Sequence, residues 1–347
     1  MPRYNAAYEI HVHGEVPLRS DVTFEPVIYT RQNPVAAGEY REQTAKGKFL
    51  INGSLTSAER RGESGEKLDG HDTRGHIKSN GRFDIDDDWR WGFDVERATD
   101  DTYLQRYRLM QRYRFLNSNT LTSDAFVEGF RGNNYASAYS YAFQGLRTAD
   151  DPGLAPLVMP LVNANYVTDP GEYGGHYFLD ANALSIYRSE GTKDQRAATR
   201  FGWTLPYTTS HGQIYTMSLT NYLQFYYATA IGSDRDQFRP TEEGASARYM
   251  PQLDLMWRYP FVSHQAGYTT IVETITSIDL APNLGDQNKF PNEDSRTVDF
   301  DETNLFRPNR FSGVDRLDTG QRVNYGVNAD VRSAWGGQIG RAHVRTP

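Results

Sequence analysis

The sequence predicts an all-β protein: an antiparallel transmembrane β-barrel, present as an incomplete, open curved sheet of roughly 12 to 14 strands. Two observations lead to this expectation. Apolar and polar residues alternate with period two along stretches of more than ten residues. Such stretches are about twice as long as strands of soluble proteins and match the ~9–11 residues of a tilted membrane strand. Turns and polar loops separate them, at about 20 to 25 residues per strand and loop.

The clearest alternation runs from residue 212 to residue 229. One face is apolar and aromatic, interrupted only by Asn221: Tyr215, Met217, Leu219, Leu223, Phe225 and Tyr227. The other face is polar: Thr216, Ser218, Thr220 and Gln224. Residues 134–144 and 176–187 repeat the pattern. Residues 75–99 predict a hairpin whose two apolar-alternating strands flank the turn 86–88.

Composition agrees with a membrane barrel and excludes several other classes. The mean hydropathy of the 347 residues is −0.69, and no apolar run approaches the ~18 residues of a membrane-spanning helix. A barrel tolerates this polarity because only every second residue faces lipid. The net charge of −7 gives no sign of a nucleic-acid partner. The absence of cysteine excludes disulfide and thiolate chemistry. The first residues form no apolar segment, so no signal peptide is predicted there.

The connections between strands are of two kinds. The turn 86–88 is tight, whereas residues 57–74, 147–154, 189–195 and 231–247 predict long polar loops. Membrane barrels alternate in this way, with short turns on the periplasmic side and longer loops outside.

No motif for catalysis, cofactor binding or metal binding stands out, so we expect neither an enzyme nor a cofactor. His11 and His13 share a strand face, but no third metal ligand is spaced to join them. The carboxylates Asp84, Asp86, Asp87 and Asp88 lack the glycine and glutamate of a calcium loop, which favours a plain hairpin turn. The acidic stretch 294–302 could hold a divalent cation, but a solvated loop is the preferred interpretation.

The segment 290–327, FPNEDSRTVDFDETNLFRPNRFSGVDRLDTGQRVNYGV, resembles the barrel signature of the LptD family of lipopolysaccharide-assembly proteins. We call it the signature segment. Its matching positions are Asn292, Glu293, Asp294, Ser295, Asp301, Asn304, Leu305, Phe306, Asn309, Arg310, Gly313, Asp315, Arg316, Gly320, Arg322, Tyr325 and Gly326.

Shorter similarities extend this resemblance over most of the chain. They lie at residues 23–26, 39–41, 100–104, 188–196 and 248–251. Each is weak alone. Together they place the chain in the first half of a family barrel of 26 strands.

The resemblance implies a function. A member of this family assembles lipopolysaccharide into the outer leaflet of the outer membrane of a Gram-negative bacterium, through a barrel lumen and a lateral gate. Its implied partners are lipopolysaccharide, the membrane, an LptE-like lipoprotein that plugs the lumen, and an LptA-like periplasmic bridge. That bridge would meet the family's N-terminal periplasmic domain, which this chain lacks.

The expected organisation has three parts. Residues 1–20 would be the end of the periplasmic region and the entry to the barrel, and residues 21–337 the partial barrel. Residues 338–347 lose the alternation and resemble a translated sequencing-adapter tail, so we expect them to be non-native.

Pro26 is the candidate lateral-gate residue. Proline removes a donor from the ladder of a sheet and therefore belongs at an edge or a weakened seam. In the family, prolines of the first strands loosen the seam that opens to release lipopolysaccharide, and Pro26 matches one such position. A proline that merely initiates a strand is an equally good interpretation, and Pro2 is a weaker companion.

Two alternatives remain open. A general porin or receptor barrel would carry a ring of lumen charges. A soluble β-rich carbohydrate-binding protein would place the aromatic face in a core. If the barrel is incomplete, two unpaired edges in hydrocarbon would cost several kcal/mol per group, so we expect the isolated chain neither to insert stably nor to transport.

Overall fold

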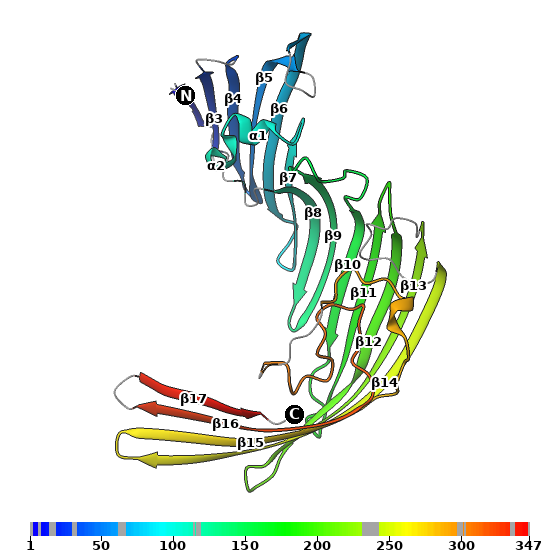
Figure 1. The fold of residues 1–347 in the computed structure, drawn as a ribbon. Helices are drawn as coiled ribbons and strands as arrows, with labels where there is room; N and C mark the ends of the chain where they lie inside the picture. The colour runs from blue at the N-terminus through cyan, green and yellow to red at the C-terminus, as the bar shows by residue number, and fades with distance from the viewer. Residues whose placement is uncertain are drawn as a thin grey trace. The chain divides into compact units, whose positions relative to one another are not determined.

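The computed structural model describes residues 3–5, 8–13, 19–29, 33–61, 67–113, 115, 119–230, 243–296, 301, 303–333 and 337–345. Nearly all of them lie in antiparallel strands or the connections between strands (Figure 1). The chain divides into two compact units, one of residues 1–162 and 185–191 and one of residues 163–184 and 192–347. The described helices are short, and none could cross a bilayer. The all-β, antiparallel expectation is confirmed.

In the first unit, neighbouring strands pair in sequence order. The strands are β1 (Arg3–Asn5), β2 (Tyr8–His13), β3 (Arg19–Tyr29), β4 (Val35–Thr44), β5 (Gly47–Arg61), β6 (Lys67–Asp84), β7 (Trp89–Ala98), β8 (Thr120–Arg131) and β9 (Asn134–Gly145). From β2 to β9 each strand is antiparallel to the next, and β1 pairs with β3 beyond the end of β2.

Two strands, β10 (Leu157–Val167) and β11 (His176–Tyr187), contribute residues to both units. The second unit continues with β12 (Lys193–Thr208), β13 (Ile214–Thr229), β14 (Gly244–Gln265), β15 (Tyr268–Leu280), β16 (Gln321–Ser333) and β17 (Gly337–Arg345). Each strand from β12 to β17 is again antiparallel to the next. Within residues 21–337 the strands β3 to β16 number fourteen, the upper end of the expected range.

Short and long connections both occur, as the sequence predicts. Hairpins with two to five linking residues join β4 to β5, β6 to β7, β8 to β9, β12 to β13 and β14 to β15. Long connections follow β7 and β15, at residues 99–119 and 281–320. The predicted loop 57–74 is wrong over most of its length, because Ser57 pairs with Thr73 and Glu59 with His71. Backbone hydrogen bonds can form whatever the side chains are. A polar stretch of sequence can therefore also be a strand.

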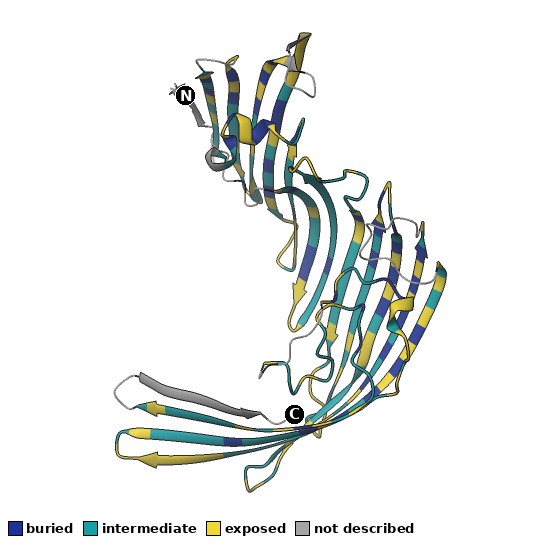
Figure 2. Ribbon diagram, viewed as in Figure 1, coloured by how far each residue is buried: buried dark blue, intermediate teal, exposed yellow. Residues whose placement is uncertain are grey.

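The side-chain faces are inverted relative to a soluble protein. Along β13 the aromatic and aliphatic face is exposed, with Leu219 at 48% and Phe225 at 51%. The face that holds Thr220 and Gln224 is buried. Figure 2 shows the resulting alternation along the strands of the second unit. An exposed apolar face beside a buried polar face is the pattern of a wall with lipid on one side. The soluble alternative, with the aromatic face in a core, does not fit this strand.

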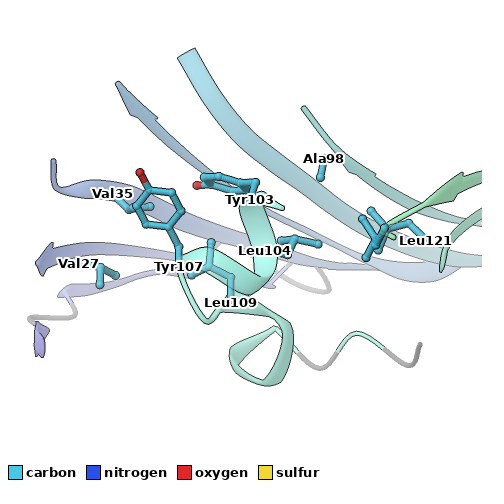
Figure 3. Packing of buried hydrophobic residues seen from close by; sticks show 9 residues of the cluster. Val27, Val35, Ala98, Tyr103, Leu104, Tyr107, Leu109 and Leu121 are labelled. Carbon is cyan, nitrogen blue, oxygen red and sulfur yellow. The ribbon is translucent and has the colours of Figure 1, made fainter. Parts of the chain in front are cut away.

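The first unit has a small apolar core on its polar side, made by the connection 99–119. This connection contains α1 (Tyr103–Arg106) and α2 (Leu109–Arg112). Tyr103, Leu104 and Leu109 are almost fully buried against the sheet residues Val27 and Val35 (Figure 3). The short DDTYL similarity at residues 100–104 therefore marks a segment that folds back onto the sheet.

Hydrogen bonds fix this connection to strands β5 and β6. The hydroxyl of Ser54 lies 2.7 Å from the Tyr103 hydroxyl and 2.6 Å from Nδ1 of His76. Arg74 donates to the carboxylate of Asp100 through Nε, at 2.7 Å. Burial by itself raises the pKa of Asp100, but the hydrogen bond from Arg74 outweighs it and lowers that pKa to about 2. Buried polar groups on the strands are thus satisfied by the connection that covers them.

The exposed apolar face predicts a strong asymmetry between neighbouring positions of β13. Leu219→Arg places a charge on the lipid side, and we expect it to destabilise the full-length protein by about 2–4 kcal/mol. Thr216→Arg, on the opposite face, is the matched control and should cost little. The measurement is the free energy of unfolding in lipid vesicles. Equal losses for both variants would contradict a lipid-facing role for this face.

Candidate functional site

The signature segment runs through the long connection between β15 and β16 and into the start of β16, and the connection packs on the polar face of the second unit. Figure 1 shows this connection in orange against β11 to β14. Strand side chains bind its backbone directly: Nε2 of Gln224 donates to the Val314 carbonyl at 2.9 Å, and Nε2 of Gln252 to the Pro308 carbonyl at 3.0 Å. Leu317 completes the contact by packing, 1% exposed, beside Tyr222 and Met250. We call residues 281–320 the docked loop.

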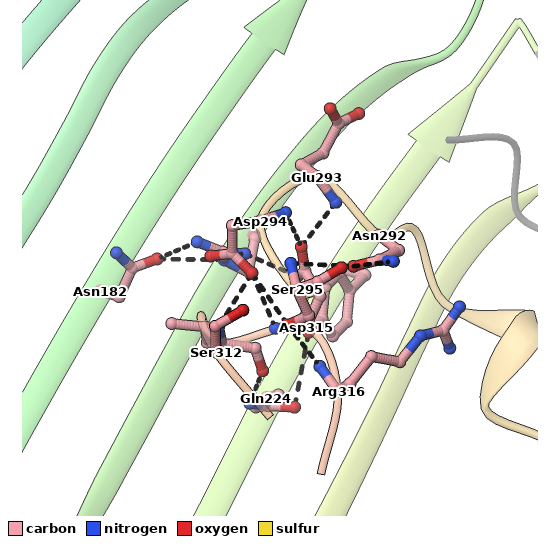
Figure 4. A network of polar contacts seen from close by, with 12 residues as sticks. Asn182, Gln224, Asn292, Glu293, Asp294, Ser295, Ser312, Asp315 and Arg316 are labelled. Atoms are coloured by element: carbon pink, nitrogen blue, oxygen red, sulfur yellow. Dashed lines mark hydrogen bonds and ion pairs between the residues drawn. The ribbon is translucent and has the colours of Figure 1, made fainter. Parts of the chain in front are cut away.

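Two aspartates join the two arms of the docked loop, one arm around Asp294 and the other around Asp315, by reciprocal hydrogen bonds. The carboxylate of Asp294 accepts hydrogen bonds from the backbone amides of Val314 and Asp315, at 2.8 and 3.1 Å. The carboxylate of Asp315 accepts from the amides of Glu293 and Asp294, at 2.7 and 3.1 Å (Figure 4). Each arm therefore satisfies backbone donors of the other, which would otherwise be costly to bury.

Arg196, near the start of β12, binds both aspartates. Its Nη1 lies 2.6 Å from Oδ1 of Asp315 and 2.9 Å from Oδ2 of Asp294. Its side chain is 1% exposed and that of Asp315 is fully buried. Asn182 of β11 orients the guanidinium by accepting from Nε and Nη2, at 3.0 and 2.7 Å. We call Arg196, Asp294 and Asp315 the clasp.

The charge of Asp294 is stabilised by its surroundings. Partial burial by itself raises the pKa of its carboxyl, but the charge of Arg196 and the amides of Val314 and Asp315 outweigh that effect. The pKa of Asp294 is therefore below its usual range. The expectation of a solvated acidic loop is wrong for this residue, because its carboxylate is engaged in the clasp.

A second basic residue, Arg248 of β14, fixes the backbone beside the clasp. Its Nη2 donates to the Asp315 carbonyl at 2.5 Å and to the Tyr226 hydroxyl at 3.2 Å. Its guanidinium lies 4.6 Å from the centre of the Phe290 ring. Arg196 and Arg248 belong to the short sequence similarities at 188–196 and 248–251, so the tertiary structure joins those similarities to the signature segment.

The C-terminal arm of the docked loop is anchored to β15 and β16. Asp318 accepts hydrogen bonds from Arg310 and from Arg322 of β16. Arg322 also lies 3.3 Å from Asp279 of β15 and donates to the Pro308 carbonyl at 2.7 Å. Asn309 accepts the amide of Asp318 at 3.1 Å.

Local turns account for further signature positions. Asn292 and Ser295 close a turn, with the Ser295 amide donating to Asn292 at 3.0 Å. Gly313 has a φ of +72°, and a Cβ there would lie 2.3 Å from the Asp294 carboxylate. Gly320, also at positive φ, precedes β16. The structure thus explains both glycines by conformation, and Gly313 by close approach as well.

Other signature residues lie away from the clasp. Asp301 and Asn304 form their own turn with Leu305 and Phe306, in which the Leu305 amide donates to the Asp301 carbonyl at 3.1 Å. Arg316 binds the backbone of Gln287. Tyr325 is 50% exposed on β16, next to Gly326.

Sequence reasoning missed the strand residues that receive the docked loop. Asn182, Gln224, Tyr226 and Gln252 all sit on the polar face of their strands. Alternation places Asn182 and Gln224 on that face, but it could not have shown that a loop 40 residues long covers them.

Pro26 lies within β3 rather than at its start, and it pairs with Ala36 of β4. On its other side, the described pairings stop at Phe24 for β2 and resume at Val27 for β1. Residues 6 and 7 lie outside the described residues, as does Pro2. The gate role stays a prediction.

The metal candidates are not assembled into a site in the described part of the chain, where no group of three or more potential ligands occurs. Asp86 accepts the amides of Asp88 and Trp89, at 2.9 and 2.8 Å, in the hairpin turn. The side chains of His11 and His13 lie outside the described residues. Residues 337–345 form β17, and their non-native origin stays a prediction.

The clasp predicts that docking of the loop depends on both charges. Asp315→Asn leaves the buried Arg196 with only the partly exposed Asp294, and Arg196→Met leaves both aspartates without their cation, which we expect to cost up to about 3–5 kcal/mol. In the full-length protein, a protease should then cleave within residues 281–320 much faster. Glu172→Gln, in the exposed turn 168–175, is the control for loss of a carboxylate. Unchanged cleavage in both clasp variants would show that docking does not need the clasp.

The lowered pKa of Asp294 fixes the direction of a pH effect. A carboxyl with a lowered folded-state pKa contributes stability that is complete above its unfolded pKa, about 3.9, and is lost as pH falls toward the folded value. Docking should therefore be constant from neutral pH to about pH 4.5 and weaken below about pH 4. Cleavage by an acid-active protease across this range measures it. Loosening that begins near neutral pH would contradict this assignment.

Comparisons with known proteins agree with this architecture. A family model described as LptD, LPS transport system D, matches residues 72–344. An LPS-assembly protein LptD of Methylococcus capsulatus is 22% identical over 325 residues, covering 89% of this chain and 29% of its own length. One from Sodalis glossinidius is 22% identical over 322 residues, covering 90% of this chain and 40% of its own.

The chain therefore spans less than half the length of these relatives. A solved structure, a bacterial polysaccharide outer membrane secretin, aligns with 99% of this chain and 91% of its own at 9% identity, with a TM-score of 0.29 that is too low to bear on the fold. The family match extends over most of the residues, from β6 to β17, and includes the whole signature segment. The chain belongs to the LptD family.

Proposed function

We propose that this chain forms part of the wall of an outer-membrane barrel that assembles lipopolysaccharide into the outer leaflet. The observation that carries the proposal is the inverted pair of faces, apolar outside and polar inside, in a chain of this family. Lipopolysaccharide has a large sugar head and several acyl chains. A polar inner face suits the head, and an apolar outer face keeps the wall in lipid.

The docked loop supports a role in shaping the inner side of the wall. It occupies the polar face of β12 to β14 through the clasp, Arg248 and Gln252. A loop held by buried ion pairs is fixed in place and narrows the space beside the wall. We propose that it defines the path of the sugar head rather than moving with each transport step.

Lateral release would occur at Pro26. Proline cannot donate to the ladder, and Pro26 lies within β3, where it pairs with Ala36 of β4. A seam with fewer hydrogen bonds opens at lower cost. The whole protein would take its substrate from an LptA-like periplasmic bridge and hold an LptE-like lipoprotein in its lumen. We propose no catalytic step for it.

Complementation tests this function. A Gram-negative strain depleted of its own LptD would receive the full-length gene that contains this segment. We expect newly made lipopolysaccharide to reach the cell surface again, measured with a membrane-impermeant label. A variant with the clasp mutation Asp315→Asn should restore less. Correct insertion of the full-length protein without any surface lipopolysaccharide would refute the proposal.

The gate has its own test. Pro26→Ala restores one ladder donor, worth about 0.5–1.5 kcal/mol, so the opened state should become about 2- to 10-fold rarer. Surface delivery should slow by a similar factor in the complemented strain. Pro206→Ala, within β12 of the second unit, is the matched strand-proline control and should have no effect. Equal delivery by the wild type and Pro26→Ala would exclude a gate at this residue.

A further inference from the structure

A pocket lies in the second unit where the docked loop meets the polar face of the wall. It is an open pocket of about 500 Å³, bounded by β10 to β14 on one side and by residues 307–309 on the other. This volume falls within the ~300–1,000 Å³ of small-molecule sites. The pocket is separate from the clasp, none of whose three residues lines it.

Six of the thirteen residues that line the pocket have neutral hydrogen-bonding side chains. They are Asn165, Thr204, Ser218, Thr220, Tyr222 and Asn309. Thr204 and Ser218 lie side by side on neighbouring strands, with their hydroxyls 3.1 Å apart. An acyl chain placed here would take water from these groups and offer them no hydrogen bond in return, which is unfavourable. The lining therefore does not suit the apolar part of a lipid.

One charge of the pocket is already paired: Arg200 lies 2.7 Å from Asp180. Asp254 lines the pocket as a buried residue. The guanidinium of Arg200 also lies 5.1 Å from the centre of the Phe178 ring. A flat guanidinium on a ring presents a planar surface with hydrogen-bond donors at its rim.

Two further groups have hydrogen-bonding capacity to spare. In the described part of the chain, the side chains of His176 and Arg307 make no hydrogen bond or ion pair, and both line the pocket. Donors and acceptors thus surround the space on several sides. A ligand with hydroxyl groups around a compact ring would meet them in several directions at once.

We propose that this pocket binds a neutral, hydroxyl-rich sugar ring. The inference rests on the proposed function, which it deepens by naming the part of the substrate that the wall recognises here. Hydroxyls of the ring exchange hydrogen bonds with Ser218, His176 and Arg307, while one face of the ring lies along the planar surface of Arg200. The docked loop supplies one side of the site, so sugar binding requires the loop in place.

The test is saturation-transfer NMR on the full-length protein in detergent. The probes are the methyl glycosides of glucose, galactose and N-acetylglucosamine, with inorganic phosphate followed by its phosphorus line width. We expect ring-proton signals from at least one glycoside, reduced about threefold or more by Arg307→Ala and by His176→Ala, in line with the loss of about 0.5–1.5 kcal/mol per hydrogen bond. Phosphate should not broaden.

Two matched controls accompany the variants. Arg296→Ala removes another exposed arginine of the docked loop that lies outside the pocket, and His211→Ala removes a turn histidine. Both should keep the full sugar signal. No signal from any glycoside, or signals unchanged in both pocket variants, would overturn the proposal. Phosphate broadening that Arg307→Ala abolishes would replace it with an anion site.

This outcome is independent of surface delivery. If the protein binds the glycosides but fails to restore lipopolysaccharide to the surface, the sugar-binding pocket stands and the proposed function is refuted. If the protein restores delivery but does not bind the glycosides, only the sugar-binding proposal is refuted.

Discussion

The buried ion pair between Arg196 and Asp315 is the interaction on which the second unit depends. It joins a strand of the wall to a loop more than a hundred residues later in the chain. Two charges removed from water cost several kcal/mol each unless every donor and acceptor is satisfied. Here Asn182, the second aspartate and two backbone amides complete the set. Because all of these contacts must form to offset the cost of burial, they require one arrangement of the loop.

The inverted wall explains why such an arrangement is needed. In a soluble protein the apolar face of a sheet packs against other apolar residues and the polar face contacts water. In this chain the apolar face of β13 is exposed, and it is the polar face that packs. A polar face can pack only through hydrogen bonds and ion pairs of defined geometry. The connection 99–119 meets the same demand in the first unit, where Tyr103 and Asp100 bind Ser54 and Arg74.

The proposed function combines a loop that is fixed in place with a seam that can open. The docked loop is held by charges, and its edge forms a pocket rich in neutral polar groups. In the first unit, β3 contains Pro26, the candidate gate residue, which pairs with Ala36 of β4. The proposed guiding of an amphiphile along a wall and its release sideways would require a rigid inner surface and a weakened seam.

Alternation by itself determined the class of this protein and many of its strands. Residues 176–187 are a strand with the expected bounds, and the hairpin around residues 86–88 is in place. This succeeded because period two reflects the two faces of a strand, which is a local property. It failed for residues 57–74, where a strand is polar on both faces. Only the tertiary structure decided that Arg196, Arg248 and the signature segment form one cluster. Partners more than a hundred residues apart carry no periodic signal, and their meeting depends on how the loop folds back onto the wall.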